Sequence, residues 1–224
     1  FSLRDAPAGG REPGSSSSKP GIGFREALAN LFSQPGFLRV LAFWGLLGVV
    51  SWLIVGWLPT FYKERLELTQ GVAGLYATGY INTMAMLGVL VGGILADRWS
   101  RINPRARILV PAIGMCLAAP AVFLASNSVL VTVAVGGFMV YGLTKAFTDA
   151  NMMPILCMIA DQRYRATGYG VLNMCSCIVG GIGLYAGGSL RDADIELGYI
   201  FQTASVIMLV CAALLFTLRP GKRD

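Results

Sequence analysis

The sequence predicts an all-α polytopic membrane protein with six transmembrane helices. Of its 224 residues, 55% are hydrophobic and 13% are charged, and the mean hydropathy is +0.62. A soluble domain carries about 25% charged residues. A helix needs roughly 20 residues to cross about 30 Å of hydrocarbon, and in lipid its backbone groups must find partners within the helix itself. Six apolar stretches meet this need, at residues 37–59, 72–96, 108–125, 129–160, 167–190 and 197–218.

The basic residues concentrate on one side of the predicted spans. Fourteen of the 18 Lys and Arg residues lie near or before the start of the first span, in the second–third and fourth–fifth loops, or after the last span. Three lie in the opposite loops. Because cytoplasmic loops carry an excess of Lys and Arg, both termini are expected in the cytoplasm. The net charge of +6 therefore reflects topology, and no nucleic-acid partner is expected.

A polar segment precedes the first span. It is rich in glycine, serine and proline ("PAGGREPGSSSSKPG"), a composition typical of flexible linkers. We expect a cytoplasmic linker (1–35), a transmembrane domain (36–218) and a basic cytoplasmic tail (219–224).

A short amphipathic helix is expected at the end of this linker. The segment "GFREALANLF" places Phe24, Leu28, Leu31 and Phe32 on one helical face. Such a face is typical of a helix that lies at the membrane surface. A frayed linker helix is the alternative.

The first span has no ionisable residue between Val40 and Pro59. Trp57, near its outer end, fits the belt of aromatic residues found where proteins cross the membrane surface. Trp44 and Trp52 lie deeper, and they either form an apolar cavity wall or face lipid.

The second and fifth spans share two short segments. "ATGY" occurs at residues 77–80 and 166–169, and "VGGI" at 91–94 and 179–182. The two helices start on opposite sides of the membrane, as an inverted repeat of three helices plus three requires. Chance matches between glycine-rich segments are the alternative.

Both of these spans carry glycines and an asparagine. Pairs of glycines four residues apart let helices pack closely. Asn82 and Asn173 need hydrogen-bond partners at membrane depth. Either interhelical bonds or the hydroxyl groups of a substrate could supply them. The glycine pairs are Gly88 with Gly92 and Gly183 with Gly187.

The fourth span contains two ionisable residues near its centre. Insertion scales assign a Lys or Asp there about 2.5–3.5 kcal/mol each. Lys145 and Asp149 share an arc of about 160° with other polar side chains, at about 100° per residue. Such a face must line a water-filled cavity or meet polar partners. The polar residues on this arc are Tyr141, Thr144, Lys145, Thr148, Asp149 and Asn151.

Two interpretations of these charges stay open. The pair either locks the helix in a neutral form or handles a substrate or proton in a cavity. Pro154 leaves the carbonyl of Ala150, beside Asp149, without its helical donor, which predicts a kink there. Transporters often break helices at their binding sites.

The loop between the second and third spans reads "GGILADRWSRINPRAR". Its Gly93, Asp97, Arg98 and Arg101 resemble the cytoplasmic signature of the major facilitator superfamily, G-x-L-a-D-r-x-G-r-r, whereas the serine at 100 and the isoleucine at 102 depart from it. In such a loop Gly93 would allow a close helix contact. Asp97 would accept bonds, from a helix N-terminus or an arginine, that are released when the helices rock.

The resemblance extends over nearly the whole chain. The linker, six spans and signature loop look like the C-terminal half of a twelve-helix facilitator, whose partner would be the missing N-terminal six-helix half. The first and fourth of these spans would line the central cavity. "GWLPTFYKERLELTQGVAGLYATGY" and "DANMMPILCMIADQRYRATGYGVLN" are similar to the organic-anion and hexuronate symporters and to the spinster-like branch. This implies an integral protein of the bacterial inner (plasma) membrane.

The resemblance implies a secondary active transporter that works by alternating access. Its substrate would be a small organic solute such as an organic anion or a sugar acid, and its coupling ion a proton or sodium, with no other cofactor. Lys145 would attract the anionic group, and Asp149 would carry the proton. A spinster-like lipid or sugar exporter is the alternative. The other candidate binding residues are Tyr141, Thr148, Asn151, Asn82, Asn173 and Trp52.

Other classes of membrane protein fit less well. An embedded enzyme needs clustered catalytic groups, but the chain has no histidine. A six-helix channel or a non-transporting scaffold would be favoured by a repeated pore motif, which the sequence lacks. The five cysteines all fall in apolar segments, which predicts neither a metal site nor disulfides.

Overall fold

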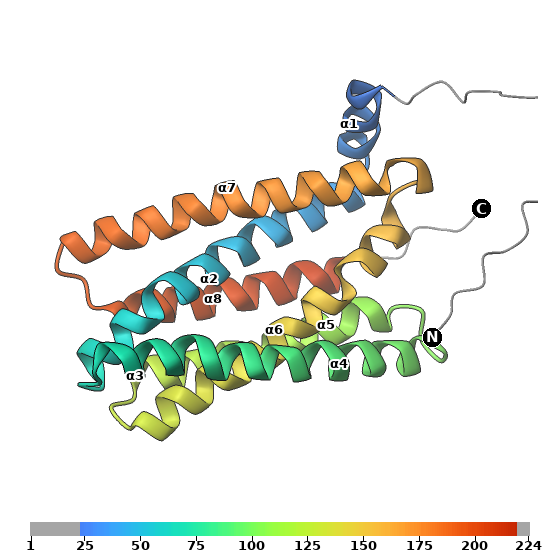
Figure 1. The fold of residues 1–224 in the computed structure, drawn as a ribbon. Helices are drawn as coiled ribbons and strands as arrows, with labels where there is room; N and C mark the ends of the chain where they lie inside the picture. The colour runs from blue at the N-terminus through green and yellow to red at the C-terminus, as the bar shows by residue number, and fades with distance from the viewer. Residues whose placement is uncertain (1–22, 219–224) are drawn as a thin grey trace, which may run out of the picture.

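The computed structural model describes residues 23–218. Most of the predicted linker (1–22) and the basic tail (219–224) lie outside the described residues. Within this range the chain is helical and has no strand, and the long helices form one elongated bundle (Figure 1). Six segments of this described part are long and apolar enough to cross a membrane. The predicted all-α fold with six spans is confirmed.

The spans begin and end close to the predicted residues. The first is longer than expected, because it continues past Pro59 to Arg65, and buried Phe61 and Tyr62 anchor this last part. The second contains a π-helical segment that includes the first "ATGY". The elements are α2 (Pro35–Arg65), α3 (Gln70–Gly74), η1 (Leu75–Tyr80), α4 (Ile81–Ser100), α5 (Ala106–Asn127), α6 (Val131–Ile159), η2 (Gln162–Tyr164), α7 (Arg165–Asp192) and α8 (Leu197–Thr217).

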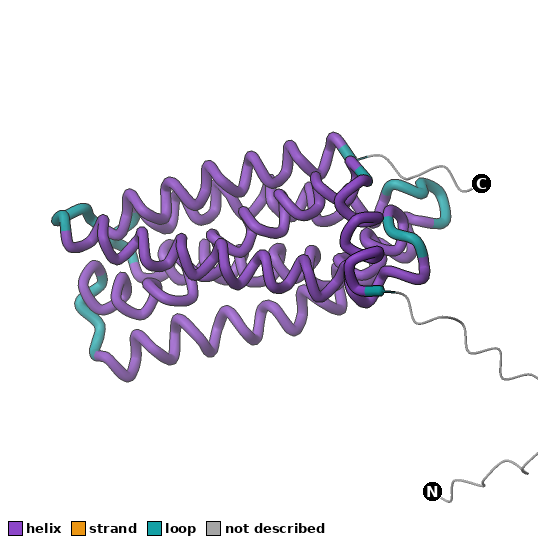
Figure 2. Tube along the Cα trace, turned by 90° about the horizontal axis from the view of Figure 1, so that it is seen from above, coloured by secondary structure: helices purple, strands orange, loops and turns teal. Residues whose placement is uncertain are grey.

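The loops gather at the two ends of the bundle (Figure 2). One end holds the α4–α5 and α6–α7 connections, together with the start of α2 and the end of α8 (Figure 1). The other end holds the α2–α3, α5–α6 and α7–α8 connections. We call the first of these the inner end, because it carries most of the basic residues, and the second the outer end.

A short helix, α1 (Phe24–Ser33), precedes the first span at the inner end. Its Leu31 is fully buried, and the helix contacts α2 and α7. Phe24 and Phe32 are 66% and 45% exposed. The predicted apolar face is therefore divided between packing on the bundle and exposure at its inner end.

The second and fifth spans make equivalent contacts. Gly92, in the first "VGGI", lies against Phe147 of α6, and Gly180, in the second, lies against Trp52 of α2. The next glycine in each segment, Gly93 or Gly181, has no atom within 4 Å of an added Cβ among the described residues. Matching positions thus have matching surroundings, which supports the inverted repeat over a chance match.

The helix pairs show the same symmetry. Helix α4 packs along α6, and α7 packs along α2. The repeats are α2, α4 and α5, and α6, α7 and α8. Their third helices, α5 and α8, pack on each other, and each also packs on the first helix of the other repeat, α6 or α2. Between them, edge-to-face aromatic contacts link Phe61 of α2, Phe138 of α6 and Phe201 of α8. Exchanging the two repeats therefore converts α4–α6 into α2–α7 and α5–α6 into α2–α8, and leaves α5–α8 unchanged.

Helices α4 and α7 are the least covered of the spans. Only 22% of the most apolar window of each is buried, against 44–56% in the other four. Both carry a stripe of exposed apolar residues at a spacing of four, and the two stripes are related by a constant offset of 88 positions. They consist of Met86, Leu90 and Ile94 on α4 and Met174, Ile178 and Ile182 on α7.

Candidate functional site

Lys145 and Asp149 form an ion pair in the middle of α6. Lys145 Nζ donates to Asp149 Oδ2 at 2.7 Å, and the two side chains remain 28% and 37% exposed. The structure has three further ion pairs among residues 23–218, and all of them join residues at or near helix ends. This pair is therefore the one set of paired charges within the body of a described span.

The predicted polar arc is divided between the surface and the core. Thr144, Thr148 and Asn151 are 3%, 0% and 2% exposed. They are covered because α4 and α5 both pack on α6. The open strip is narrower than the helical wheel indicates, and it runs through Lys145, Asp149 and the 41% exposed Met153.

The buried members of the arc hold α6 to its neighbours. Tyr141 OH donates to Ser51 Oγ of α2 at 3.4 Å. Asn151 Nδ2 donates to Phe147 O of its own helix at 2.9 Å and lies 3.5 Å from Gly92 O of α4. Both side chains therefore link the helix that carries the ion pair to another span.

Thr148 lies between the two charged residues, and Pro154 follows them on the same helix. The hydroxyl of Thr148 is buried and has no hydrogen-bond partner in the described part of the chain. Pro154 does not end the helix, which continues to Ile159. The fourth span is therefore one continuous helix from Val131 to Ile159.

The other predicted binding residues lie on different helices. Trp52 is 43% exposed and stands against Gly180. Asn82 is exposed on α4, and Asn173 donates to Tyr169 O of its own helix at 3.1 Å. Within residues 23–218 no hydrogen bond joins these side chains to Lys145 or Asp149.

The signature loop carries an ion pair at the inner end. Asp97 Oδ1 accepts from Arg107 Nη2 at 3.0 Å, so the second span is tied to the start of the third. Arg98 and Arg101 are exposed. The close glycine contact expected at Gly93 is made instead by its neighbour Gly92, within the described residues.

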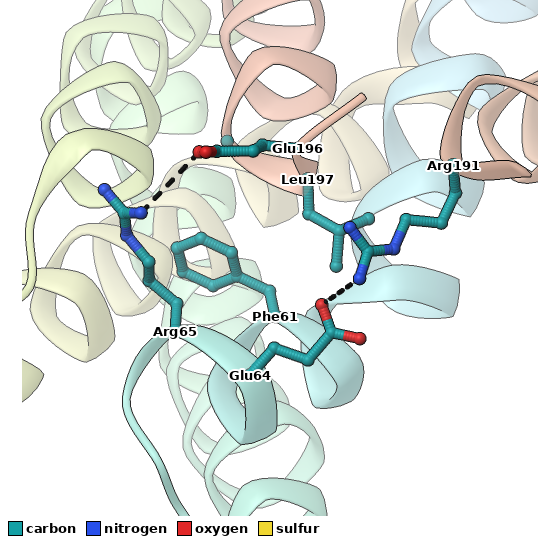
Figure 3. Close-up of a pocket in the computed structure, with 7 residues that line it drawn as sticks. Phe61, Glu64, Arg65, Arg191, Glu196 and Leu197 are labelled. Carbon is teal, nitrogen blue, oxygen red and sulfur yellow. Dashed lines mark hydrogen bonds and ion pairs between the residues drawn. The ribbon is translucent and has the colours of Figure 1, made fainter. Parts of the chain in front are cut away.

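A pocket at the outer end was not predicted from the sequence. Figure 3 shows two ion pairs across it, Glu64 with Arg191 at 2.5 Å and Arg65 with Glu196 at 3.6 Å. They join the end of α2 to the last turn of α7 and to the α7–α8 connection. The sequence offered one signal, namely that the outer loops hold few basic residues and these lie close to acidic ones. Phe61, Leu197 and Gly198 complete the lining.

Comparison with known families identifies the chain. The family described as the Major Facilitator Superfamily matches residues 2–184. The chain belongs to the major facilitator superfamily. It is thus an integral membrane protein of a transporter family, with six helices able to cross the bilayer.

Solved structures show the same facilitator fold. The crystal structure of a bacterial homologue of the human lysosomal transporter Spinster, inward-facing and unoccupied, matches with a TM-score of 0.65 and 18% identity over 96% of this chain. The inward-facing, occupied form matches with a TM-score of 0.64 and 18% identity over 92% of this chain. The match covers 52% of each of those chains, so this facilitator chain spans about half their length. No curated protein matches it.

Two residues outside the predicted sites contact predicted ones. Arg107, one of the basic residues of the second–third loop, pairs with the signature residue Asp97. Its place at the start of the next helix, ten positions after Asp97, was the available signal. Ser51, a polar residue in the otherwise apolar first span, accepts a hydrogen bond from Tyr141 of the fourth span.

Proposed function

We propose that this chain is one half of a secondary active transporter and that Lys145 and Asp149 form its charged binding element. The observation that supports this is the 2.7 Å ion pair in the body of α6, whose two side chains stay partly exposed while the other polar residues of the same arc are buried. Polar groups at this depth that stay accessible belong beside a water-filled passage.

The chemistry of Lys145 favours an anionic substrate. An ammonium group has three N–H donors, and one of them is used by Asp149 in the described structure. The remaining donors can bind a carboxylate or phosphate oxygen of a solute. A small organic anion or sugar acid is therefore the proposed substrate class.

Asp149 supplies a means of coupling transport to protons. An ionised Asp149 and a substrate anion compete for the same ammonium group. When Asp149 takes up a proton it loses its charge, and Lys145 then pairs with the substrate. Release of substrate and proton restores the ion pair, so the cavity never holds an unpaired charge, which is costly in a membrane. Proton and anion thus move in the same direction.

The missing partner is proposed to be a second six-helix half. The apolar stripes on α4 and α7 lie on the two least covered spans, 22% buried against 44–56% in the other four, so these two helices have the most surface left to contact further helices. The chain also spans about half of the structures it resembles. Alternating access would then be the rocking of the two halves, with the Asp97–Arg107 pair adjusting at the inner end.

The proposed location is the bacterial inner membrane, with both termini in the cytoplasm. The inner end of the bundle holds the loops that contain Arg98, Arg101, Arg163 and Arg165. The excess of basic residues in these loops supports this orientation.

Counterflow into vesicles that contain the full-length protein tests the proposal. The screen covers sugar acids, neutral sugars and lysolipids, so that it also distinguishes a spinster-like lipid or sugar exporter. Lys145→Ala should abolish uptake of the anionic substrate, whereas Lys63→Ala, at an exposed outer lysine, should not. Unchanged uptake by Lys145→Ala would rule out the assignment.

A further inference from the structure

Two arginines meet the last turn of α8 at the inner end. Arg39, from the first turns of α2, donates to Thr217 O at 3.3 Å. Arg105, at the start of α5, donates to Leu218 O at 2.8 Å and to Phe216 O at 3.3 Å. These carbonyls lack helical donors because the helix ends there, so the arginines satisfy them.

No carboxylate of the described residues neutralises either guanidinium group. Neither one forms an ion pair among the ion pairs of residues 23–218. Arg105 Nε is buried and has no hydrogen-bond partner in that part of the chain. Each guanidinium has five N–H donors, and most of these are not used by the α8 carbonyls. The arrangement therefore still has donors and positive charge for an anion.

The arginines border a hollow that also has an apolar wall. Leu214, Phe216 and Thr217 of α8 line it together with Arg39 and Arg105. Phe216 is 46% exposed. Two cations beside an apolar wall, at the end of a bundle of spans, match a molecule with an anionic group next to hydrocarbon. A free phosphate ion would have no use for the apolar wall.

We propose that this hollow between α2, α5 and α8 binds the phosphate of an anionic phospholipid from the cytoplasmic leaflet. The proposal relies on the orientation given under Proposed function, but not on the roles of Lys145 and Asp149. Basic pockets between transmembrane helices on the cytoplasmic side are known to bind anionic head groups. Because Arg105 lies near the end of the loop between the second and third spans, the bound lipid holds this part of the loop to α2 and α8.

Native mass spectrometry of the full-length protein tests the site. The probes are phosphatidylglycerol, zwitterionic phosphatidylcholine and inorganic phosphate. Wild-type protein should retain phosphatidylglycerol in preference to phosphatidylcholine. Arg39→Gln should weaken phosphatidylglycerol binding about fivefold, as expected for one basic residue at an anionic surface. Arg163→Gln, which removes an exposed arginine from the same end, is the matched control.

Arg39→Gln is the variant used in the test, because Arg39 makes only one hydrogen bond to α8. Arg105 makes two, so Arg105→Gln could loosen that helix. Thermal unfolding with and without phosphatidylglycerol gives a second readout. The lipid should raise the melting temperature of wild-type protein and of Arg163→Gln more than that of Arg39→Gln. Equal binding of both phospholipids, or equal loss in both variants, would overturn the proposal. Complete displacement of the lipid by millimolar inorganic phosphate would show a free-anion site instead.

Discussion

Gly92 of α4 lies against Phe147 of α6, the residue midway between Lys145 and Asp149. A Cβ at position 92 would come within 2.6 Å of Phe147 Cδ1 and 2.8 Å of its Cα. Because one of these atoms belongs to the backbone, a side chain at 92 must move α6 itself. The close packing of the second span thus sets the position of the helix that carries the ion pair.

Gly92→Ala should destabilise the protein and disturb transport together. Overpacking of a tight contact costs about 1–3 kcal/mol. Gly93→Ala adds the same methyl group one position later, where no atom of the described chain lies within 4 Å. Thermal unfolding of the full-length protein should show a lower melting temperature for the first variant than for the second. Equal destabilisation would contradict the packing described here.

Asp149→Asn should separate exchange from accumulation. The amide resembles a permanently protonated carboxyl, so the substrate can still bind at Lys145 and exchange across the membrane. A proton gradient, however, can no longer drive uptake. Counterflow should persist in this variant while pH-driven accumulation is lost, and Asp192→Asn, at an exposed aspartate ending α7, should keep both. Normal pH-driven accumulation in Asp149→Asn would remove this residue from the proton pathway.

The Asp97–Arg107 pair should affect transport more than stability. Its side chains are 67% and 36% exposed, and exposed pairs contribute about 0–1 kcal/mol. Asp97→Asn should therefore leave the melting temperature nearly unchanged but slow transport. The double exchange Asp97→Arg with Arg107→Asp should recover part of the rate that either single change loses. If the double variant is no faster than the single ones, the pair has no part in the conformational change.

The two outer ion pairs should differ in strength. Glu64 and Arg191 are 2.5 Å apart, whereas Arg65 and Glu196 are 3.6 Å apart and Glu196 is 67% exposed. Double-mutant cycles with Gln replacements, read by thermal unfolding, should give a larger coupling energy for the first pair. Both values should remain near or below about 1 kcal/mol and decrease with added salt. An equal or reversed order would contradict the geometry in Figure 3.

The six spans and their repeat could be predicted because they depend on local composition. The "VGGI" segments mark equivalent contacts, and the stripes that contain Met86 and Met174 follow the same offset. Apolar length and small-residue spacing are properties of one helix alone. The sequence therefore carries them directly.

The details of the site could not be predicted because they depend on neighbouring helices. A helical wheel places Thr148 beside Asp149, but only the position of α4 and α5 decides that Thr148 is buried. Gly92 and Gly93 are neighbours in the sequence, and only the orientation of α4 against α6 determines that Gly92 makes the contact. The pairing of Asp97 with Arg107 depends on how the loop folds back.

The most direct test of the central claim is proton uptake on substrate binding. Purified full-length protein is mixed with its anionic substrate in a weakly buffered solution, and the pH is recorded. If the substrate replaces Asp149 beside Lys145, the wild-type solution becomes more alkaline as Asp149 takes up a proton, and Asp149→Asn gives no change. Proton uptake by Asp149→Asn equal to that of the wild type, with substrate bound in both, would contradict the account.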